Sequence, residues 1–370
     1  MRAYTDENIL TFLSRKNILP KYGFPVDTVE LSVTKERSGL QLSRDLSVAI
    51  SEYAPGSQIV ANGDLITSRY IKKVPRISWK MYSYVRCPIC NTLNTKLYIE
   101  GESINSCCQC GTMFGETRET KTNVFLIPEL GFISDGKIKK PGLKRPSRTY
   151  SGEISYVGFK EDMEEHEYNI GRSRVVVKTS RNDEMAVLNR NPFFVCEQCG
   201  YTDLDEKYHA RKKEMSHNNS GGFHCSNKYL NKYALGYTFK TDVVMIDFPD
   251  YTISDWKQGL SILYAILRGA CDYLNIEESD ISGCLQMMNG SYCIIIFDNT
   301  PGGSGHAKRI DSAENLYGVL HNALTIVDGC TCGGEEGDSS CYFCLRNYRN
   351  QRHHNDLKRS YAVKFLKDIL

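Results

Sequence analysis

The sequence lacks a long apolar segment and lacks an excess of charge of either sign. It contains no run of about twenty apolar residues of the kind that spans a membrane. Charged residues interrupt the segment 1–20, which excludes the apolar core of a secretory signal peptide. We therefore expect a cytoplasmic protein with no membrane partner. The formal net charge is only +2, so contacts with nucleic acid have to come from local basic patches.

The phosphate-binding signature of the common ATPases, GxxxxGK[S/T], is also missing. A chain without this loop is not expected to drive its own movement along DNA. We favour a non-enzymatic role and assign no catalytic residue from the sequence.

Composition and periodicity predict a mixed α+β protein of ordinary solubility, because hydrophobic residues make up 41% and charged residues 24% of the 370 residues. We divide the chain into a helical and hairpin segment (1–78), a β-rich region with two zinc ribbons (79–237) and a C-terminal mixed α/β zinc-binding domain (238–370). Helices are expected at 5–18 and 41–53. Asn62-Gly63 and Asn289-Gly290 each predict a tight hairpin, since Asn-Gly tolerates two positive φ angles in succession.

Another helix should begin after Ser254 or Asp255, either of which can cap it. Its expected apolar face is formed by Trp256, Leu260, Leu263, Leu267 and Cys271.

Fifteen cysteines form the most informative pattern. Thiols in the cytosol stay reduced, so clustered cysteines indicate metal sites and not a disulfide framework. The first cluster pairs Cys87-x2-Cys90 with Cys107-x2-Cys110, the spacing of a zinc ribbon. Cys108 leaves the choice of the third ligand open.

The second cluster holds Cys196, Cys199 and Cys225 and needs a fourth ligand. His224 adjoins Cys225, and adjacent side chains seldom converge on one ion. We therefore choose His217, with His209 as a weaker alternative.

The third cluster pairs Cys330-x-Cys332 with Cys341-x2-Cys344 around a glycine-rich loop. Up to three zinc ions are expected. All would be structural, because four protein ligands leave no open position for water. The remaining cysteines Cys271, Cys284 and Cys293 lie on apolar faces and are interpreted as packed thiols.

A glycine-rich loop, Pro301–Gly305, raises an alternative function. Its backbone N–H groups could hold a phosphate, and Asp298 or His306 could then serve a nuclease or hydrolase acting on DNA. We favour a plain strand-to-helix turn that needs glycine for its geometry.

Two basic stretches are candidates for nucleic-acid contact. The C-terminal stretch follows the third cluster, is interleaved with aromatic residues, and contributes Arg346, Arg349, Arg352, Lys358 and Arg359. The other is a loop with proline, glycine and no acid, which contributes Lys139, Lys140, Lys144 and Arg145.

The C-terminal third resembles a known family. The segment 297–305 reads FDNTPGGSG, the third cysteine cluster follows, and 345–351 reads LRNYRNQ. These motifs are similar to the zinc-binding domain at the C terminus of MrfA-type helicases. The same domain occurs in the DrmB subunit of the DISARM anti-phage system. Further likeness at LPKYGFPV (19–26) and YAPG (53–56) extends the resemblance over nearly the whole chain.

The resemblance implies a zinc-binding accessory subunit of a helicase-type ATPase in anti-phage defence. Its second partner would be DNA, as a single strand or a duplex end.

Overall fold

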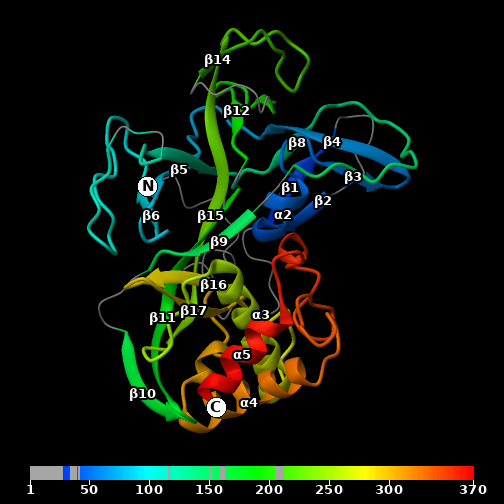
Figure 1. The fold of residues 1–370 in the computed structure, drawn as a ribbon. Helices are drawn as coiled ribbons and strands as arrows, with labels where there is room; N and C mark the ends of the chain where they lie inside the picture. Colours follow the sequence, from blue (N-terminus) through cyan, green and yellow to red (C-terminus); the bar gives the residue numbers. More distant parts are fainter. Residues whose placement is uncertain are drawn as a thin grey trace.

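The computed structural model describes residues 28–33, 40, 42–115, 117, 119–149, 152–158, 163–189, 191–204 and 212–370. The architecture is mixed α+β and rich in strands, as the sequence predicts (Figure 1). The helix expected at 5–18 lies outside the described residues. Within the described part, no helix is both long enough and apolar enough to cross a membrane.

The N-terminal part contains a five-stranded sheet in the order β2-β1-β8-β4-β3. Its strands are β1 (Thr28–Ser32), β2 (Leu42–Asp45), β3 (Gln58–Ala61), β4 (Asp64–Ile71) and β8 (Phe132–Ser134). The short helix α2 (Leu46–Glu52) follows β2. The helix expected at 41–53 was therefore partly wrong. Leu42–Asp45 pair with β1 as a strand, and the helix begins only at Leu46.

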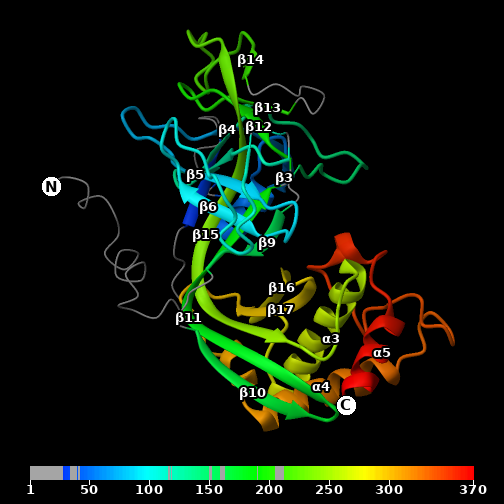
Figure 2. The same ribbon diagram turned by 60° about the vertical axis from the view of Figure 1, so that its left-hand side comes forward.

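A twelve-stranded sheet connects the two ends of the molecule. Its long strands are β11 (Ser173–Asn189) and β15 (Tyr229–Asp247), which run together between the upper and lower parts of Figure 2. The N-terminal part of this sheet adds β5 (Lys80–Arg86), β6 (Leu93–Leu97), β7 (Asn123–Ile127), β9 (Gly152–Tyr156), β12 (Phe193–Val195), β13 (Thr202–Asp203) and β14 (Lys212–Glu214). The C-terminal part adds β10 (Glu164–Ile170), β16 (Ile281–Met288) and β17 (Ser291–Asp298).

β15 passes straight through the boundary proposed at 237/238. It pairs with β7 and β12 at its start and with β17 at its end. The parts of the chain on either side of this boundary therefore share one continuous strand.

Both Asn-Gly hairpins are confirmed. β3 pairs with β4 around Asn62 and Gly63, and β16 pairs with β17 around Asn289 and Gly290. All four turn residues have positive φ, between 50° and 82°. This is the geometry that makes the turn follow the twist of its strands.

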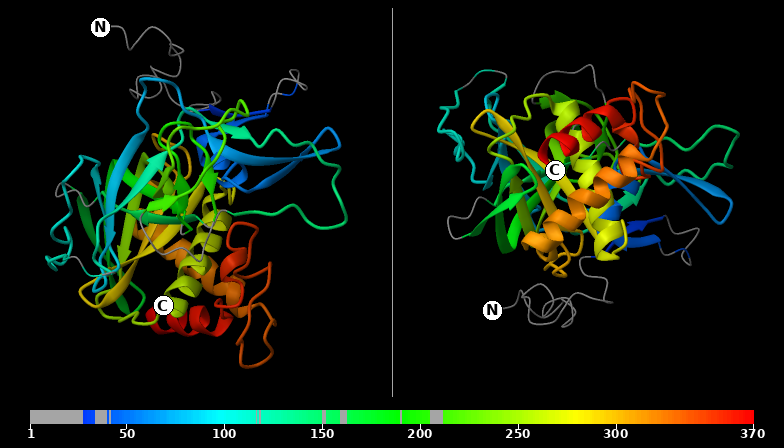
Figure 3. Two further views of the ribbon diagram at one scale, coloured as in Figure 1. Left: turned by 90° about the horizontal axis from the view of Figure 1, so that it is seen from above. Right: turned by 60° about the horizontal axis from the view of Figure 1, so that its bottom comes forward.

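Three helices cover one face of the C-terminal sheet: α3 (Trp256–Leu274), α4 (Ala313–Asp328) and α5 (Arg359–Ile369) (Figure 3). Asp255 caps α3 by accepting a hydrogen bond from the Lys257 N–H, which settles the choice between Ser254 and Asp255. The largest core lies between these helices and the sheet. A second core, in the N-terminal half, lies around Leu31, Ile50 and Phe125.

The expected apolar face of α3 is only partly buried. Leu260 and Leu263 are buried, but Trp256, Leu267 and Cys271 are half-exposed. The best-buried side of α3 is instead formed by Ile262, Ile266 and Ala270, which the expected face does not include.

Candidate metal centres and the adjoining cleft

The first cysteine cluster is built from two turns of the same shape. The Cys87 N–H donates to the Thr92 carbonyl at 2.9 Å, and the Asn91 N–H donates to the Cys87 carbonyl at 2.9 Å. An equivalent pair of bonds closes the turn from Cys107 to Gly111. Asn91 and Gly111, which follow the second cysteine of each pair, have φ of 57° and 70°. Only residues that tolerate this left-handed conformation fit there.

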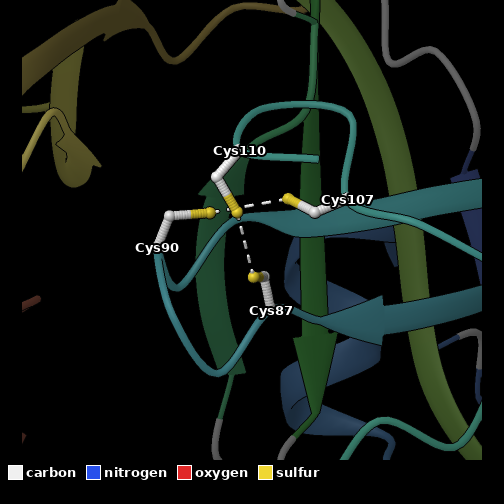
Figure 4. Close-up of side chains that lie close together, drawn as sticks. All are labelled: Cys87, Cys90, Cys107 and Cys110. Atoms are coloured by element: carbon white, nitrogen blue, oxygen red, sulfur yellow. Dashed lines mark hydrogen bonds between the residues drawn. The ribbon is translucent and has the colours of Figure 1, made fainter. Parts of the chain in front are cut away.

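All four sulfur atoms of this cluster point toward one centre (Figure 4). Cys87 and Cys110 have sulfurs 3.5 Å apart, as do Cys90 and Cys107. Cys108 is exposed and does not belong to the group, so Cys107 supplies the third donor sulfur of the set.

The second cluster repeats the turn and adds a histidine. The Cys196 N–H donates to the Tyr201 carbonyl at 2.9 Å, and Gly200 donates back to Cys196 at 2.8 Å. His217 is buried and stacks on Tyr201, with ring centroids 4.8 Å apart.

The hydrogen bonding of His217 makes it a suitable metal ligand. Its Nδ1 lies 3.0 Å from the Met215 carbonyl, which can only accept, so the proton is on Nδ1. The other ring nitrogen, Nε2, is buried without a hydrogen-bond partner among the described residues. Its lone pair therefore faces the three thiols. His224 is exposed, and His209 lies outside the described residues.

The third cluster closes between the end of α4 and the loop before α5. Cys330 and Cys341 have sulfurs 3.6 Å apart, and Cys332 and Cys344 have sulfurs 3.5 Å apart. Cys330 and Cys344 also belong to the largest hydrophobic core.

The donor atoms of every set fit a zinc ion. Within each cluster they lie within 4.8 Å of one another. A tetrahedral zinc with bonds of about 2.3 Å holds its sulfurs about 3.8 Å apart. The observed sulfur pairs, 3.5 to 3.8 Å, are close to this spacing and far from that of a disulfide.

Hydrogen bonds within the clusters shift the pKa values of individual thiols in both directions. The bond from Cys199 lowers the pKa of Cys196 to about 4 and raises the pKa of Cys199 itself. The hydrogen bond with Thr112 lowers the pKa of Cys110 to about 6. Thiolates packed this closely need a positive charge, which zinc supplies. Since each set is complete with four protein ligands, the ions would hold structure and not activate water.

The expected role of Arg359 in nucleic-acid contact is corrected by its surroundings. The guanidinium is only 9% exposed and donates to the carbonyls of Val327, Cys332 and Gly334, at 2.9 to 3.3 Å. It braces the loop of the third cluster and is not placed to meet DNA.

The other basic residues after the third cluster are accessible to differing degrees. Arg349 and Arg352 are exposed, whereas Lys358 is half-exposed beside Tyr361. Arg346 is half-buried and donates to the Ser340 hydroxyl at 2.9 Å and to the His354 carbonyl at 3.2 Å.

The basic loop lies apart from that stretch, beside the β3–β4 hairpin. Leu65 and Lys139 exchange backbone hydrogen bonds, and Lys140 forms an ion pair of 3.0 Å with Asp64. Lys139, Lys140, Lys144 and Arg145 are all exposed.

The glycine-rich loop is a turn whose amides are used internally. Asp298 is fully buried and accepts hydrogen bonds from the N–H groups of Ser304, His306 and Ala307. Asp242 accepts from Gly305 at 3.1 Å. The Gly302 and Gly303 amides donate to backbone carbonyls. No amide of the segment 302–307 is left for a phosphate, and the Asp298 carboxylate is fully used by backbone N–H groups. The strand-to-helix interpretation is favoured over the nuclease one.

Of the three remaining cysteines, Cys293 is fully buried, whereas Cys271 and Cys284 are half-buried.

A cleft of about 650 Å³ lies between the two halves, and no sequence pattern predicts it. Its walls come from many separate parts of the chain. They include the first ribbon with Arg86, the end of the basic loop with Arg148, the strands β9, β15, β16 and β17, the side of α3, and the arginine stretch after the third cluster. Spacing alone could not bring these segments together.

The fold and the three metal centres define a strand-rich zinc-binding protein. Residues 262–345 match the family model described as the MrfA Zn-binding domain, which confirms the resemblance for this segment. Over 419 aligned residues the chain is 23% identical to the Druantia protein DruE of Escherichia coli (strain UMEA 4076-1). That alignment covers 99% of this chain but only 22% of DruE, so the chain spans about a fifth of this curated relative.

Similar solved structures are those of the DUF1998 helicase MrfA. The DNA-bound form has a TM-score of 0.45 and 9% identity, covering 93% of this chain and 34% of that chain. Another structure of the same helicase has a TM-score of 0.38 at the same identity and coverage. The specific likeness to DrmB stays a prediction.

Proposed function

We propose that this chain is a zinc-stabilised, non-motor DNA-binding module that works beside a helicase-type ATPase in anti-phage defence. We place it in the cytoplasm. DISARM in particular stays a prediction from the sequence.

The observation that carries the DNA-binding part is the position of three arginines beside the third zinc cluster. Arg346, Arg349 and Arg352 line the same cleft, and none has a carboxylate partner among the described residues. Arg349 and Arg352 are exposed, and exposed arginines without acids are suited to neutralise phosphates, whereas Arg346 is half-buried. Tyr342, Phe343 and Tyr348 lie exposed in the same segment, where they can stack on bases.

The helicase part is supported by the match of residues 262–345 to the MrfA Zn-binding domain and by the likeness to DruE. The defence role is inferred from the resemblance to anti-phage subunits in the same sequence motifs.

Binding of labelled DNA by the full chain at increasing salt tests the first part. We expect affinity that falls steeply with salt and falls further in the double variant Arg349→Gln/Arg352→Gln. Arg172→Gln is the matched control, since Arg172 is exposed and does not line the cleft. Salt-independent or undetectable binding would contradict the proposal.

Co-purification tests the second part. The helicase encoded by a neighbouring gene should be retained by the tagged chain, and its DNA-stimulated ATP turnover should change when the chain is added. Brisk ATP turnover by the isolated chain would show instead that it carries a motor.

A further inference from the structure

The cleft between the two halves combines a positive charge with an aromatic wall. Its lining includes six arginines and two glutamates. Arg86 pairs with Glu153 at 3.5 Å, and Arg268 pairs with Glu278. Four arginines therefore remain without an acidic partner in the described part of the chain: Arg148, Arg346, Arg349 and Arg352.

The arginine loop is held in a fixed shape. Asn350 is fully buried and donates to the Leu345 carbonyl at 2.8 Å. Asn347 accepts from the N–H groups of Arg349 and Asn350, each at 2.9 Å. The loop that carries the arginines is thus organised before any ligand arrives, which lowers the entropic cost of binding.

The side of α3 supplies the aromatic wall. Trp256, Leu260, Tyr264 and Leu267 repeat at helical spacing and line the cleft. Trp256 and Tyr264 are half-buried: they pack against the largest core and turn their remaining surface to the cleft. Tyr348, which is 69% exposed, lines the cleft from the arginine loop.

The opposite wall is anchored to the first metal centre. Gln286 of β16 is buried and donates to the Thr92 hydroxyl at 2.7 Å, and this hydroxyl accepts from the Cys90 thiol at 3.1 Å. The first ribbon is thereby attached to the C-terminal sheet beside the cleft.

We propose that this cleft holds a single strand of nucleic acid, with phosphates at Arg148, Arg349 and Arg352 and unpaired bases against Tyr264 and Tyr348. The inference rests on the proposed function and deepens it by naming the form of nucleic acid. A single strand is favoured over a duplex because only unpaired bases offer their faces to aromatic side chains. It is favoured over a free nucleotide because the arginines come from two separate segments and can follow a backbone.

The test is anisotropy of fluorescein-labelled oligo-dT with the full chain and three variants. Arg148→Gln, Tyr348→Ala and Tyr264→Leu should each lower the affinity for the single strand, by roughly five- to hundredfold for the tyrosines. Arg148→Gln should also reduce the salt dependence. Arg172→Gln and Tyr317→Ala are the controls, since Arg172 and Tyr317 are exposed outside the cleft, and both should leave affinity unchanged.

Photo-crosslinking with iodouridine-substituted oligonucleotide gives a second readout that does not depend on the folding of variants. Crosslinks should map to peptides containing Tyr264 or Tyr348. Crosslinks confined to the basic loop, with unchanged affinity in the three variants, would overturn the cleft site and leave DNA binding itself standing. Preference for duplex, or full displacement of the strand by ATP or dTTP alone, would also overturn it. Absence of any DNA binding by the native chain would remove the proposed function as well.

Discussion

The two metal centres of the N-terminal half and the one of the C-terminal half are embedded very differently. Cys87, Cys90 and Cys107 form a small cluster with Phe114, and Cys196 and Cys225 form another with Phe194 and Leu230. In contrast, the third centre joins the largest core of the protein. The ribbons therefore have little apolar packing of their own, whereas the third centre is attached to a sheet and three helices.

This difference in packing indicates which segments depend on zinc in place of a hydrophobic core. A segment that buries too few apolar side chains needs a disulfide or a metal to stay folded. On this account, the first two ions organise their segments, and the third pins a loop to a domain that has other sources of stability.

Removal of zinc should have the largest effect on stability, and it should affect the two ribbons far more than the C-terminal helices. Structural zinc contributes about 10–16 kcal/mol of binding energy to a small domain. We expect a strong chelator to abolish hydrogen-exchange protection at 86–114, 194–204 and 212–226 while α3, α4 and α5 keep most of theirs.

Zinc added back should restore protection in both ribbons. Equal loss of protection across ribbons and helices would show that the two regions do not differ in the way proposed.

Two glycines test how the ribbon turns are supported. Gly200 has φ of +76°, and an added Cβ would lie 1.9 Å from the Ile71 carbonyl oxygen, whereas at Gly111 nothing lies within 4 Å. Gly200→Ala should destabilise by about 4 kcal/mol, from left-handed strain and a clash with backbone. Gly111→Ala should cost only about 1 kcal/mol, from strain alone.

Thermal unfolding of zinc-loaded protein would measure both. Similar losses for the two variants would mean that the turn at Gly200 is not packed against Ile71, at the end of β4.

Arg359 tests the support of the third centre. Arg359→Met removes the donor of three carbonyls and should lower the free energy of unfolding by about 3 kcal/mol. Lys358→Met, at the half-exposed neighbour, should change it by less than about 0.5 kcal/mol.

Denaturant unfolding of the pair gives the difference directly. If the Arg359→Met variant were as stable as the native chain but had lost affinity for DNA, Arg359 would be a DNA contact and not a support of the third cluster.

Local chemistry explains which features could be predicted from the sequence. The cysteine spacing predicted all three donor sets, and His217 followed from excluding an adjacent residue. The Asn-Gly turns and the cap of α3 depend on a few neighbouring residues, so they too could be recognised. Leu42–Asp45 became a strand because β1 pairs with it, which no local pattern reports.

Features that depend on distant segments could not be predicted. The continuity of β15 across 237/238 is visible only once its partners are placed. Arg359 looked like its basic neighbours, and only the carbonyls around it reveal its role. The cleft joins many distant segments, and the half-buried side of α3 has the same periodicity as a fully buried one.

X-ray absorption at the zinc edge, combined with elemental analysis of the intact chain, tests the central claim most directly. We expect three zinc ions per chain, bound by eleven thiolates and one imidazole with no oxygen ligand. Fewer than two ions per chain, or a substantial oxygen contribution from an open site, would contradict it.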